Sequence, residues 1–363
     1  MANGHIVFRA DASISMGIGH VMRCITLAKE MQRVGKNVLF ICRDLSGNLN
    51  KYIEQQGLAV TLLPKPKVAL LSVENEYARW LEVEWRTDCK QVQKLLKGLP
   101  INPDWLVVDH YALDIRWELE ISDCVGKLFV IDDLANRCHR CHILLDENLF
   151  EDMESRYIGL VNANCIKLLG PTYALLRNEF SAMRDISRNA RNEVRRVLVF
   201  FGGSDPNGET LKVLQAIKFL DRPEIQFDVV VGMSNPQRES ISAQCKQITN
   251  VTYYCQIDYI SELMAAADLS IGAGGSTTME RCCLGLPSIV IPISSNQMQP
   301  MSELAKVGAV HLYTGPRTAG SYADLLSNYL VGNNNRQSMI KKGQFLYDGY
   351  GARRVANIMI NGA

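Results

Sequence analysis

A histidine that follows two closely spaced glycines is the first feature with chemical potential. The segment reads Gly17-Ile-Gly19-His20, and a helical pattern begins at Val21. Glycines let the backbone approach a ligand closely, and the free amides of a helix N-terminus favour an anion and disfavour an imidazolium. We therefore expect His20 to be neutral and able to accept a proton from a reacting group. A histidine that only caps the helix is the alternative.

A second glycine-rich segment has the composition of a phosphate-binding turn. It runs Gly272-Ala-Gly-Gly-Ser-Thr-Thr-Met-Glu280, between an apolar run ending at Ile271 and a helical pattern starting near Thr277. Glycines, hydroxyls and helix N-terminal amides suit a nucleotide diphosphate. The endings of a Walker A loop and of a dinucleotide fingerprint are both missing. Glu280 has two possible roles, binding ribose hydroxyls or complementing the helix dipole, and a tight turn without ligand is the alternative for the segment.

Carboxylates follow two predicted strands. Asp109 and Tyr111 come after the run Trp105–Val108, and Asp132-Asp133 ends the next run. Paired carboxylates can bind a metal or act as acid and base. Adjacent residues of an extended chain point to opposite sides, so at most one of the pair faces a given site. We expect Asp109 to orient another group and one member of the pair to be structural.

The cysteines raise the questions of redox state and metal binding. There are 11 cysteines, an odd number, and Cys282 is adjacent to Cys283. This usage favours reduced thiols in a cytoplasmic protein. The cluster Cys138-His139-Arg-Cys141-His142 has one C-x-x-C spacing but no second pair of ligands nearby. We therefore favour a structural role over a zinc site.

These segments need a scaffold of alternating strands and helices. Continuous apolar runs are typical of strands buried on both faces of a parallel sheet. Ligands of such sheets bind at the carboxyl ends of the strands, where the motifs above fall. The sequence thus predicts an α/β protein with two doubly wound domains and a ligand in the cleft between them. The predicted strands lie at residues 6–8, 38–42, 105–108, 128–131, 143–145, 197–201, 227–231, 251–255, 269–271 and 288–291.

Length, charge and hydropathy define the domains and exclude some partners. A chain of 363 residues suits two domains. The arginine-rich stretch 184–196 is the predicted linker between an N-terminal domain, 1–183, and a C-terminal domain, 197–363. A net charge of +1 provides no basic field for nucleic acid. We also expect no membrane span and no signal peptide, because no apolar run approaches the ~20 residues that cross a bilayer.

Taken together, these segments resemble the UDP-sugar hydrolases of pseudaminic acid biosynthesis, the PseG type. Each stretch is short, but they keep one order from residue 8 to about residue 297. Ala112 departs from the family, which frequently has glycine there. The matching stretches are Phe8-Arg-Ala-Asp, Gly17-Ile-Gly-His-Val-Met-Arg-Cys, Val107-Val-Asp-His-Tyr, Ile131-Asp-Asp-Leu-Ala-Asn-Arg, Leu169-Gly-Pro-Thr-Tyr, Phe201-Gly-Gly-Ser-Asp, Gly272-Ala-Gly-Gly-Ser-Thr-Thr-Met-Glu and Asn296-Gln297.

The resemblance implies a GT-B-like fold, with two Rossmann-type domains facing across a cleft. It implies hydrolysis of UDP-2,4-diacetamido-2,4,6-trideoxy-β-L-altropyranose by water attack at the anomeric carbon. Inversion, no metal and no cofactor are implied as well, and other enzymes of the pathway are partners only through shared metabolites. The candidate residues are His20 for catalysis, Gly17, Gly19, Asp109, Tyr111, Asn296 and Gln297 for the sugar, and Gly274, Gly275, Ser276, Thr277 and Glu280 for UDP.

Three other functions stay open. A GT-B glycosyltransferase resembling MurG uses a similar loop and acid, but it needs an acceptor site, often an apolar and basic membrane-facing patch. Residues 36–67 show no such patch. A UDP-sugar 2-epimerase and a sensor that binds nucleotide sugars without turnover are the others. Release of UDP from a UDP-sugar in plain buffer distinguishes a hydrolase from a transferase and from a sensor.

Overall fold

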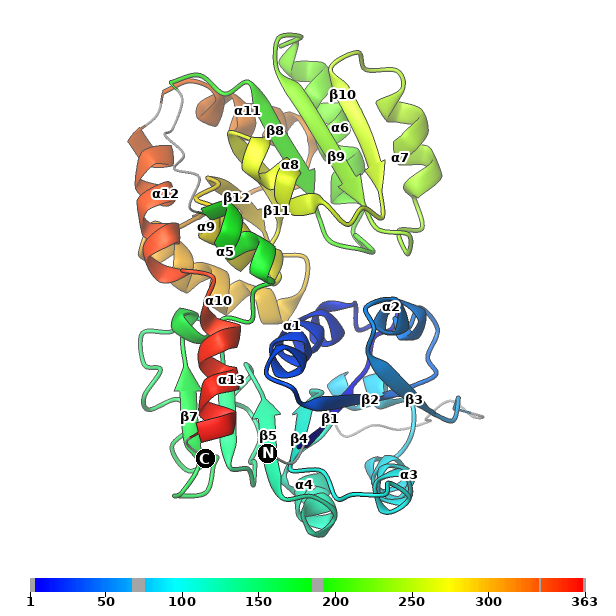
Figure 1. Cartoon of the computed structure of the whole chain (residues 1–363). Coiled ribbons are helices and arrows are strands. Elements are labelled where there is room, and N and C mark those ends of the chain that lie inside the picture. The colour runs from blue at the N-terminus through cyan, green and yellow to red at the C-terminus, as the bar shows by residue number, and fades with distance from the viewer. Residues whose placement is uncertain (1–3, 67–75, 185–191, 333, 362–363) are drawn as a thin grey trace. The chain divides into compact units, whose positions relative to one another are not determined.

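The computed structural model describes residues 4–66, 76–184, 192–332 and 334–361. The chain forms two α/β units, each built on one parallel sheet with helices against it (Figure 1). One unit comprises Met1–Leu175 together with Tyr350–Ala363, and the other comprises Leu176–Gly349. None of the described helices combines the length and the apolar character needed to span a bilayer.

The first unit contains a seven-stranded sheet in the order β3-β2-β1-β4-β5-β6-β7. Its strands are β1 (His5–Ala10), β2 (Asn37–Arg43), β3 (Ala59–Leu63), β4 (Trp105–Asp109), β5 (Lys127–Ile131), β6 (Ile143–Asp146) and β7 (Ile166–Leu169). Its helices are α1 (Gly19–Arg33), α2 (Asn50–Gln55), α3 (Trp85–Lys97), α4 (Ile115–Ile121) and α13 (Gly351–Asn361), with short 3-10 helices η1 (Glu76–Leu81), η2 (Ser122–Cys124) and η3 (Pro171–Tyr173).

The second unit repeats this order with six strands, β10-β9-β8-β11-β12-β13. The strands are β8 (Arg196–Phe200), β9 (Gln226–Val231), β10 (Val251–Cys255), β11 (Leu269–Ala273), β12 (Ser288–Ile291) and β13 (His311–Leu312). The helices are α5 (Asn178–Arg184), α6 (Glu209–Leu220), α7 (Arg238–Cys245), α8 (Ile260–Ala266), α9 (Thr277–Cys283), α10 (Ser295–Lys306), α11 (Ala319–Leu330) and α12 (Asn334–Leu346).

The central strand β1 is buried on both faces, as its apolar run predicts. Phe8 packs in one apolar cluster with residues of α1 and α13, such as Val21 and Val355. Val7 points to the other face and packs with residues of α3 and α4, such as Trp117. Because successive side chains of a strand alternate between faces, two helical layers are needed to cover this sheet. The doubly wound α/β class predicted from the sequence is therefore confirmed.

The division of the chain differs from the predicted boundaries at 183 and 197. The first unit ends at Leu175, and α5 already belongs to the second unit. The predicted linker, 184–196, lies mostly on residues outside the described ones, whereas Arg196 begins β8. The helix α13 packs on α1 and η3 of the first unit, because its apolar face completes the cluster around β1 (Figure 1). A Cβ at Gly351 would lie 2.3 Å from the Ala174 carbonyl oxygen, so the contact requires glycine.

Candidate functional site

His20 forms a dyad with the carboxylate that ends β4. The imidazole belongs to the first turn of α1 and is 7% exposed. Its Nδ1 lies 2.6 Å from Oδ1 of Asp109, which is fully buried. A carboxylate can only accept a hydrogen bond, so Nδ1 carries a proton, and in the neutral imidazole Nε2 then keeps the lone pair. Within the described part of the chain, Nε2 has no hydrogen-bond partner, and it is therefore the atom that can accept a proton from a ligand.

Arg23 holds the dyad carboxylate in its charged form. It follows His20 by three residues, and its Nε lies 2.6 Å from Oδ2 of Asp109. Burial alone would raise the pKa of Asp109, but Arg23 and His20 outweigh it and hold that pKa below its usual range. The same guanidinium reaches Asp133 at 3.0 Å and Glu147 at 3.2 Å. The dyad is thus one edge of a buried network of opposite charges.

Tyr111 closes one side of the histidine. Its hydroxyl donates to Asp133, and its ring stands edge-on to the His20 ring at a centroid distance of 4.6 Å. Burial and the Asp133 charge raise the pKa of Tyr111, so the phenol stays protonated. Two further rings, Tyr77 and Trp80 of η1, contact Tyr111 at 5.2 and 5.5 Å. The imidazole of His20 therefore lies between the charged pair Asp109–Arg23 and a group of aromatic rings.

The glycines before α1 leave space beside His20. Gly17 has φ of +82°, the left-handed region that favours glycine, and it pairs with Ser13 across a tight turn. A Cβ at Gly17 or at Gly19 would meet no atom within 4 Å. The turn is therefore open where a ligand would approach the helix N-terminus.

The two adjacent aspartates after β5 point in opposite directions. Asp133 joins the His20 side through Tyr111 and Arg23. Asp132 is fully buried on the other side and pairs with Arg137 at 2.7 Å. The expectation that only one of the pair faces the site agrees with this geometry, which makes Asp132 a structural residue.

The cluster at 138–142 does not converge on a point. Cys138 is exposed, whereas the Sγ of Cys141 lies 3.6 Å from that of Cys165. His139 is buried and bonds Glu118 at 2.6 Å, and His142 accepts from a strand amide. Burial lowers the pKa of His139, but Asp132 and Glu118 outweigh it and raise the pKa to about 9. Among the described residues, no group of three or more His, Cys, Asp or Glu side chains is placed to hold a metal.

The glycine-rich turn of the second unit follows β11 and leads into α9. Gly274 is buried, and a Cβ there would lie 2.6 Å from the Met301 Cγ. Its amide donates to Oε1 of Gln297, which also accepts from Ile293 at 2.9 Å. Gly274 and Gln297 therefore hold the turn, and in this structure neither the amide of Gly274 nor the Oε1 of Gln297 is free for a ligand. The next residues, Gly275–Thr277, are half-buried or exposed.

Glu280 lies in the first turn of α9, and its Oε1 is 3.3 Å from a guanidinium nitrogen of Arg177. Burial raises the pKa of Glu280, although Arg177 opposes the shift. Asn296 is half-buried at the start of α10, where its Oδ1 accepts from Ser294 at 2.6 Å. Below the turn, the buried Arg281 donates to the Ala273 carbonyl oxygen at 2.7 Å and fixes the strand end.

The structure sorts the predicted residues into two groups. The first unit brings His20 and Asp109 together with Tyr111, beside the turn that holds Gly17 and Gly19. The second unit brings together the turn residues Gly274, Gly275, Ser276 and Thr277 with Glu280, Asn296 and Gln297. Sequence reasoning missed Arg23, Glu147, Tyr77 and Trp80. Only Arg23 carries a signal, since its helical spacing from His20 places both on one face.

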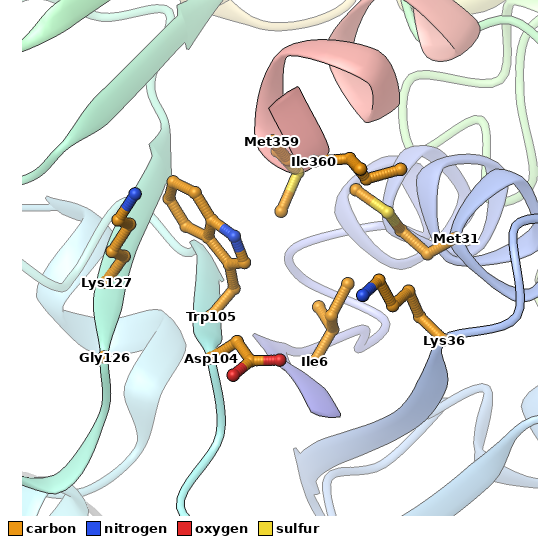
Figure 2. Close-up of a pocket in the computed structure, with 9 residues that line it drawn as sticks. All are labelled: Ile6, Met31, Lys36, Asp104, Trp105, Gly126, Lys127, Met359 and Ile360. Carbon is orange, nitrogen blue, oxygen red and sulfur yellow. The ribbon is translucent and has the colours of Figure 1, made fainter. Parts of the chain in front are cut away.

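A hollow of about 380 Å³ lies elsewhere in the first unit (Figure 2). Its lining includes Ile6, Trp105 and Lys127, which lie at the amino ends of three strands, so the hollow is at the amino ends of the sheet and not at the carboxyl ends. Trp105 is 5% exposed and Met31 is fully buried, so these walls offer a ligand little surface. Ligands of open parallel sheets bind at the carboxyl ends, where the His20 network lies.

Comparison with known proteins identifies one part of the chain. Residues 197–344 match the glycosyltransferase family 28 C-terminal domain. This segment covers most of the second unit, including the glycine-rich turn. The whole chain has a GT-B-like fold, since MurG of Acinetobacter baumannii aligns over 98% of this chain and 99% of its own, with a TM-score of 0.65 at 15% identity. The GT-B-like fold class that the resemblance implied, with two parallel-sheet α/β domains, is therefore confirmed.

Three relatives align over most of the sequence. An uncharacterised protein of Methanocaldococcus jannaschii is 25% identical over 88% of this chain, which spans only 62% of that protein. A Campylobacter jejuni protein named UDP-2,4-diacetamido-2,4,6-trideoxy-beta-L-altropyranose hydrolase is 26% identical over 84% of this chain and 97% of its own length. The spore coat polysaccharide biosynthesis protein SpsG of Bacillus subtilis is 28% identical over 98% of this chain and 97% of its own.

Proposed function

We propose that this protein hydrolyses a UDP-linked diacetamido-trideoxy sugar, releasing UDP and the free sugar. The observation that carries the proposal is the His20–Asp109 dyad, which leaves Nε2 of a near-buried imidazole as a proton acceptor. Support for the substrate class comes from the Campylobacter relative, whose name describes this reaction. The match of the second unit to glycosyltransferase family 28 supports a nucleotide-sugar ligand.

The chemistry requires an aligned water, a group to accept its proton and stabilisation of the leaving diphosphate. In the proposal, Nε2 of His20 takes the proton as the water oxygen bonds to the anomeric carbon. The bond from that carbon to the diphosphate oxygen breaks, and UDP departs with the electron pair. Attack from the face opposite the leaving group inverts the anomeric centre. A positioned base of this kind contributes about 10²–10⁴-fold to the rate.

Asp109 acts through the histidine. It fixes the Nδ1–H tautomer and stabilises the imidazolium that forms when Nε2 is protonated, while Arg23 keeps the carboxylate ionised. In the second unit, the proposal assigns the diphosphate to the turn at Gly275–Thr277 and the ribose to Glu280. Oriented amides and hydroxyls stabilise the leaving charge there without reorganisation. The amide of Gly274 is left out of this set, because Gln297 already accepts its proton.

A glycosyltransferase is the second candidate, favoured by the family 28 match at residues 197–344. The decisive experiment incubates the protein with UDP-2,4-diacetamido-2,4,6-trideoxy-β-L-altropyranose in ¹⁸O-labelled water and follows the reaction by phosphorus and carbon NMR. A hydrolase releases unlabelled UDP at a catalytic rate and places ¹⁸O on the sugar. Release of UDP only after a sugar or lipid acceptor is added would replace the proposal by the transferase. Label in UDP would contradict cleavage at the anomeric carbon.

The proposal also includes catalysis without a metal, in the cytoplasm. The 11 described cysteines are all free thiols, which fits a reducing compartment. The same assay in excess EDTA is expected to retain full activity. Loss of activity that a divalent ion restores would instead make Asp109 or Asp133 a metal ligand.

A further inference from the structure

Two rings that no motif indicated line the approach to His20. Tyr77 and Trp80 contact each other at a centroid distance of 4.9 Å, and the His20 ring meets Trp80 edge-on at 6.0 Å. Both aromatic side chains are half-buried, so part of each ring faces solvent. We propose that Tyr77 and Trp80 form the surface that contacts the C5–C6 methyl edge of the sugar, and that this surface selects a 6-deoxy amino sugar over its 6-hydroxy counterpart. The inference rests on the proposed function, since it takes the ligand to be a UDP-linked amino sugar.

The polar groups around these rings are largely occupied. The Tyr111 hydroxyl donates to Asp133, and both oxygens of Asp109 accept from His20 or Arg23. Within the described part of the chain, neither Nε2 of His20 nor Nε1 of Trp80 has a hydrogen-bond partner. A ligand hydroxyl placed against the ring faces would lose its water without gaining a partner, whereas a methyl group would not. The indole N–H remains available to the carbonyl oxygen of an acetamido group.

The ring geometry suits a contact along one side of the sugar. The Trp80 and Tyr111 planes are inclined by only 26° at a centroid distance of 5.5 Å, so they stack on each other and leave no room for a sugar between them. The ligand must therefore contact the outer surface of Trp80 and Tyr77. Aromatic surface with a few well-placed polar groups is the usual lining of small-molecule sites.

The wall formed by Tyr77 and Trp80 is anchored where η1 ends. Leu81, at its end, is 1% exposed and packs in the core with Val7. Seven residues later, Asp88 in α3 is fully buried and bonds Arg9 and Arg43, each at 2.6 Å. These contacts fix the chain directly after the two rings, and a surface that is placed before a ligand binds can select between closely similar sugars.

Binding tests the contact directly. The probe is UDP-2-acetamido-2,6-dideoxyglucose, studied by saturation-transfer NMR with irradiation of the protein's aromatic protons. In the native protein, saturation should reach the C6 methyl group. It should be lost in Trp80→Leu, which keeps apolar volume but no ring, and largely retained in Trp80→Phe. The matched control is Trp85→Leu, at a half-buried indole of α3 that stacks with Arg86 and lies outside the wall. Equal methyl saturation in native protein and Trp80→Leu would overturn the inference.

Kinetics tests the selection. UDP-N-acetylglucosamine differs from the probe only by its 6-hydroxyl, and an apolar surface rejects one added hydroxyl by no more than about 10²-fold. We expect kcat/KM to favour the 6-deoxy substrate by 10- to 100-fold, and the preference to shrink at least fivefold in Trp80→Leu. An unchanged preference in Trp80→Leu would contradict the proposed role of Tyr77 and Trp80 in selecting the sugar. The proposed hydrolysis would not be affected by that result. If neither substrate is hydrolysed but the methyl saturation depends on Trp80, the proposed hydrolysis fails and the sugar contact stands.

Discussion

The two units share a strand order but equip the carboxyl ends of their strands differently. In the first unit, charged side chains in buried ion-pair networks lie at or directly after the ends of β1, β4 and β5, with Asp11 and Asp109 fully buried. In the second unit, the turns after β8 and β11 are rich in glycines and hydroxyls, and Gly202 adopts φ of +83°. Side chains fix a proton acceptor, whereas backbone amides suit an anion. In the proposed function, one sheet topology thus supports two kinds of site through the residues of its loops.

The largest expected effect comes from breaking a second buried charge network of the first unit, which joins Asp88 to Arg9 and Arg43. Asp88→Ala would leave Arg9 and Arg43 buried without their shared carboxylate, and loss of one partner of a buried pair costs about 3–5 kcal/mol. The matched control is Asp228→Ala in the second unit, where the carboxylate is equally buried but its partner Arg196 is 34% exposed and can be solvated. Hydrogen exchange during urea unfolding measures each unit separately. Equal losses in the two variants would show that the networks do not differ as proposed.

The first unit should also lose stability in alkaline solution. The folded-state pKa of His139, about 9, lies above its ordinary value of 6.5. Its charged form is therefore favoured by folding, and the resulting stabilisation is complete below pH 6.5 and lost as the pH rises through 9. The shift corresponds to roughly 3 kcal/mol. Urea unfolding at pH 6 and pH 10 should show this difference in the native protein and little of it in His139→Gln. A pH dependence that survives the substitution would contradict this assignment.

Substitution of His20 tests whether the first unit supplies the proton acceptor. His20→Asn keeps a polar side chain but removes the proton acceptor, so kcat should fall by ~10²-fold or more. UDP affinity, measured by calorimetry, should stay nearly unchanged, because the proposal assigns UDP to the second unit. A near-normal kcat would reduce His20 to a helix cap and make Asp109 or Tyr111 the next candidate.

Substitution of Glu280 tests whether the second unit binds UDP. Glu280→Ala should weaken UDP binding by about 1.5–3 kcal/mol, the range for a hydrogen bond to a charged group. Glu239→Ala serves as the control, since that carboxylate belongs to the same unit and its side chain is 91% exposed. Calorimetry with UDP alone suffices. Equal affinity in both variants would remove Glu280 from the nucleotide site.

The sequence predicted the central elements better than the edges. The strands β4 and β11 are buried throughout, and β1 is buried except at His5; each contains an apolar run, so both sheets were predictable. The edge strand β3 (Ala59–Leu63) was missed, because it is partly exposed and its residues show no clean period. The boundary at α13 was missed as well. Its packing on the first unit depends on contacts more than 300 positions away in sequence, such as Arg353 with Glu30.

The candidate site also contains features that the sequence predicts and features that it does not. The proximity of His20, Asp109 and Tyr111 was predictable because parallel strands bring their carboxyl ends to one edge. Trp80 was not, since it lies in a connection without periodicity and meets His20 only through the fold. The hydrogen bond from the Gly274 amide to Gln297 was not predictable either. A backbone donor and a side-chain carboxamide that are 23 residues apart leave no pattern in the sequence.

The chain returns to the first unit at Tyr350, and this affects the order in which the two units can fold during synthesis. Residues 176–349 form an insertion within the first unit, whose last helix, α13, contributes Val355 and Met359 to the cluster around β1. On the ribosome, the first unit begins before the second and is completed after it. The inserted unit can thus finish folding while the apolar surface of α1 is still uncovered, because α13 has not yet been synthesised. Nascent chains that stop before α13 would expose that surface, a form that chaperones and proteases recognise.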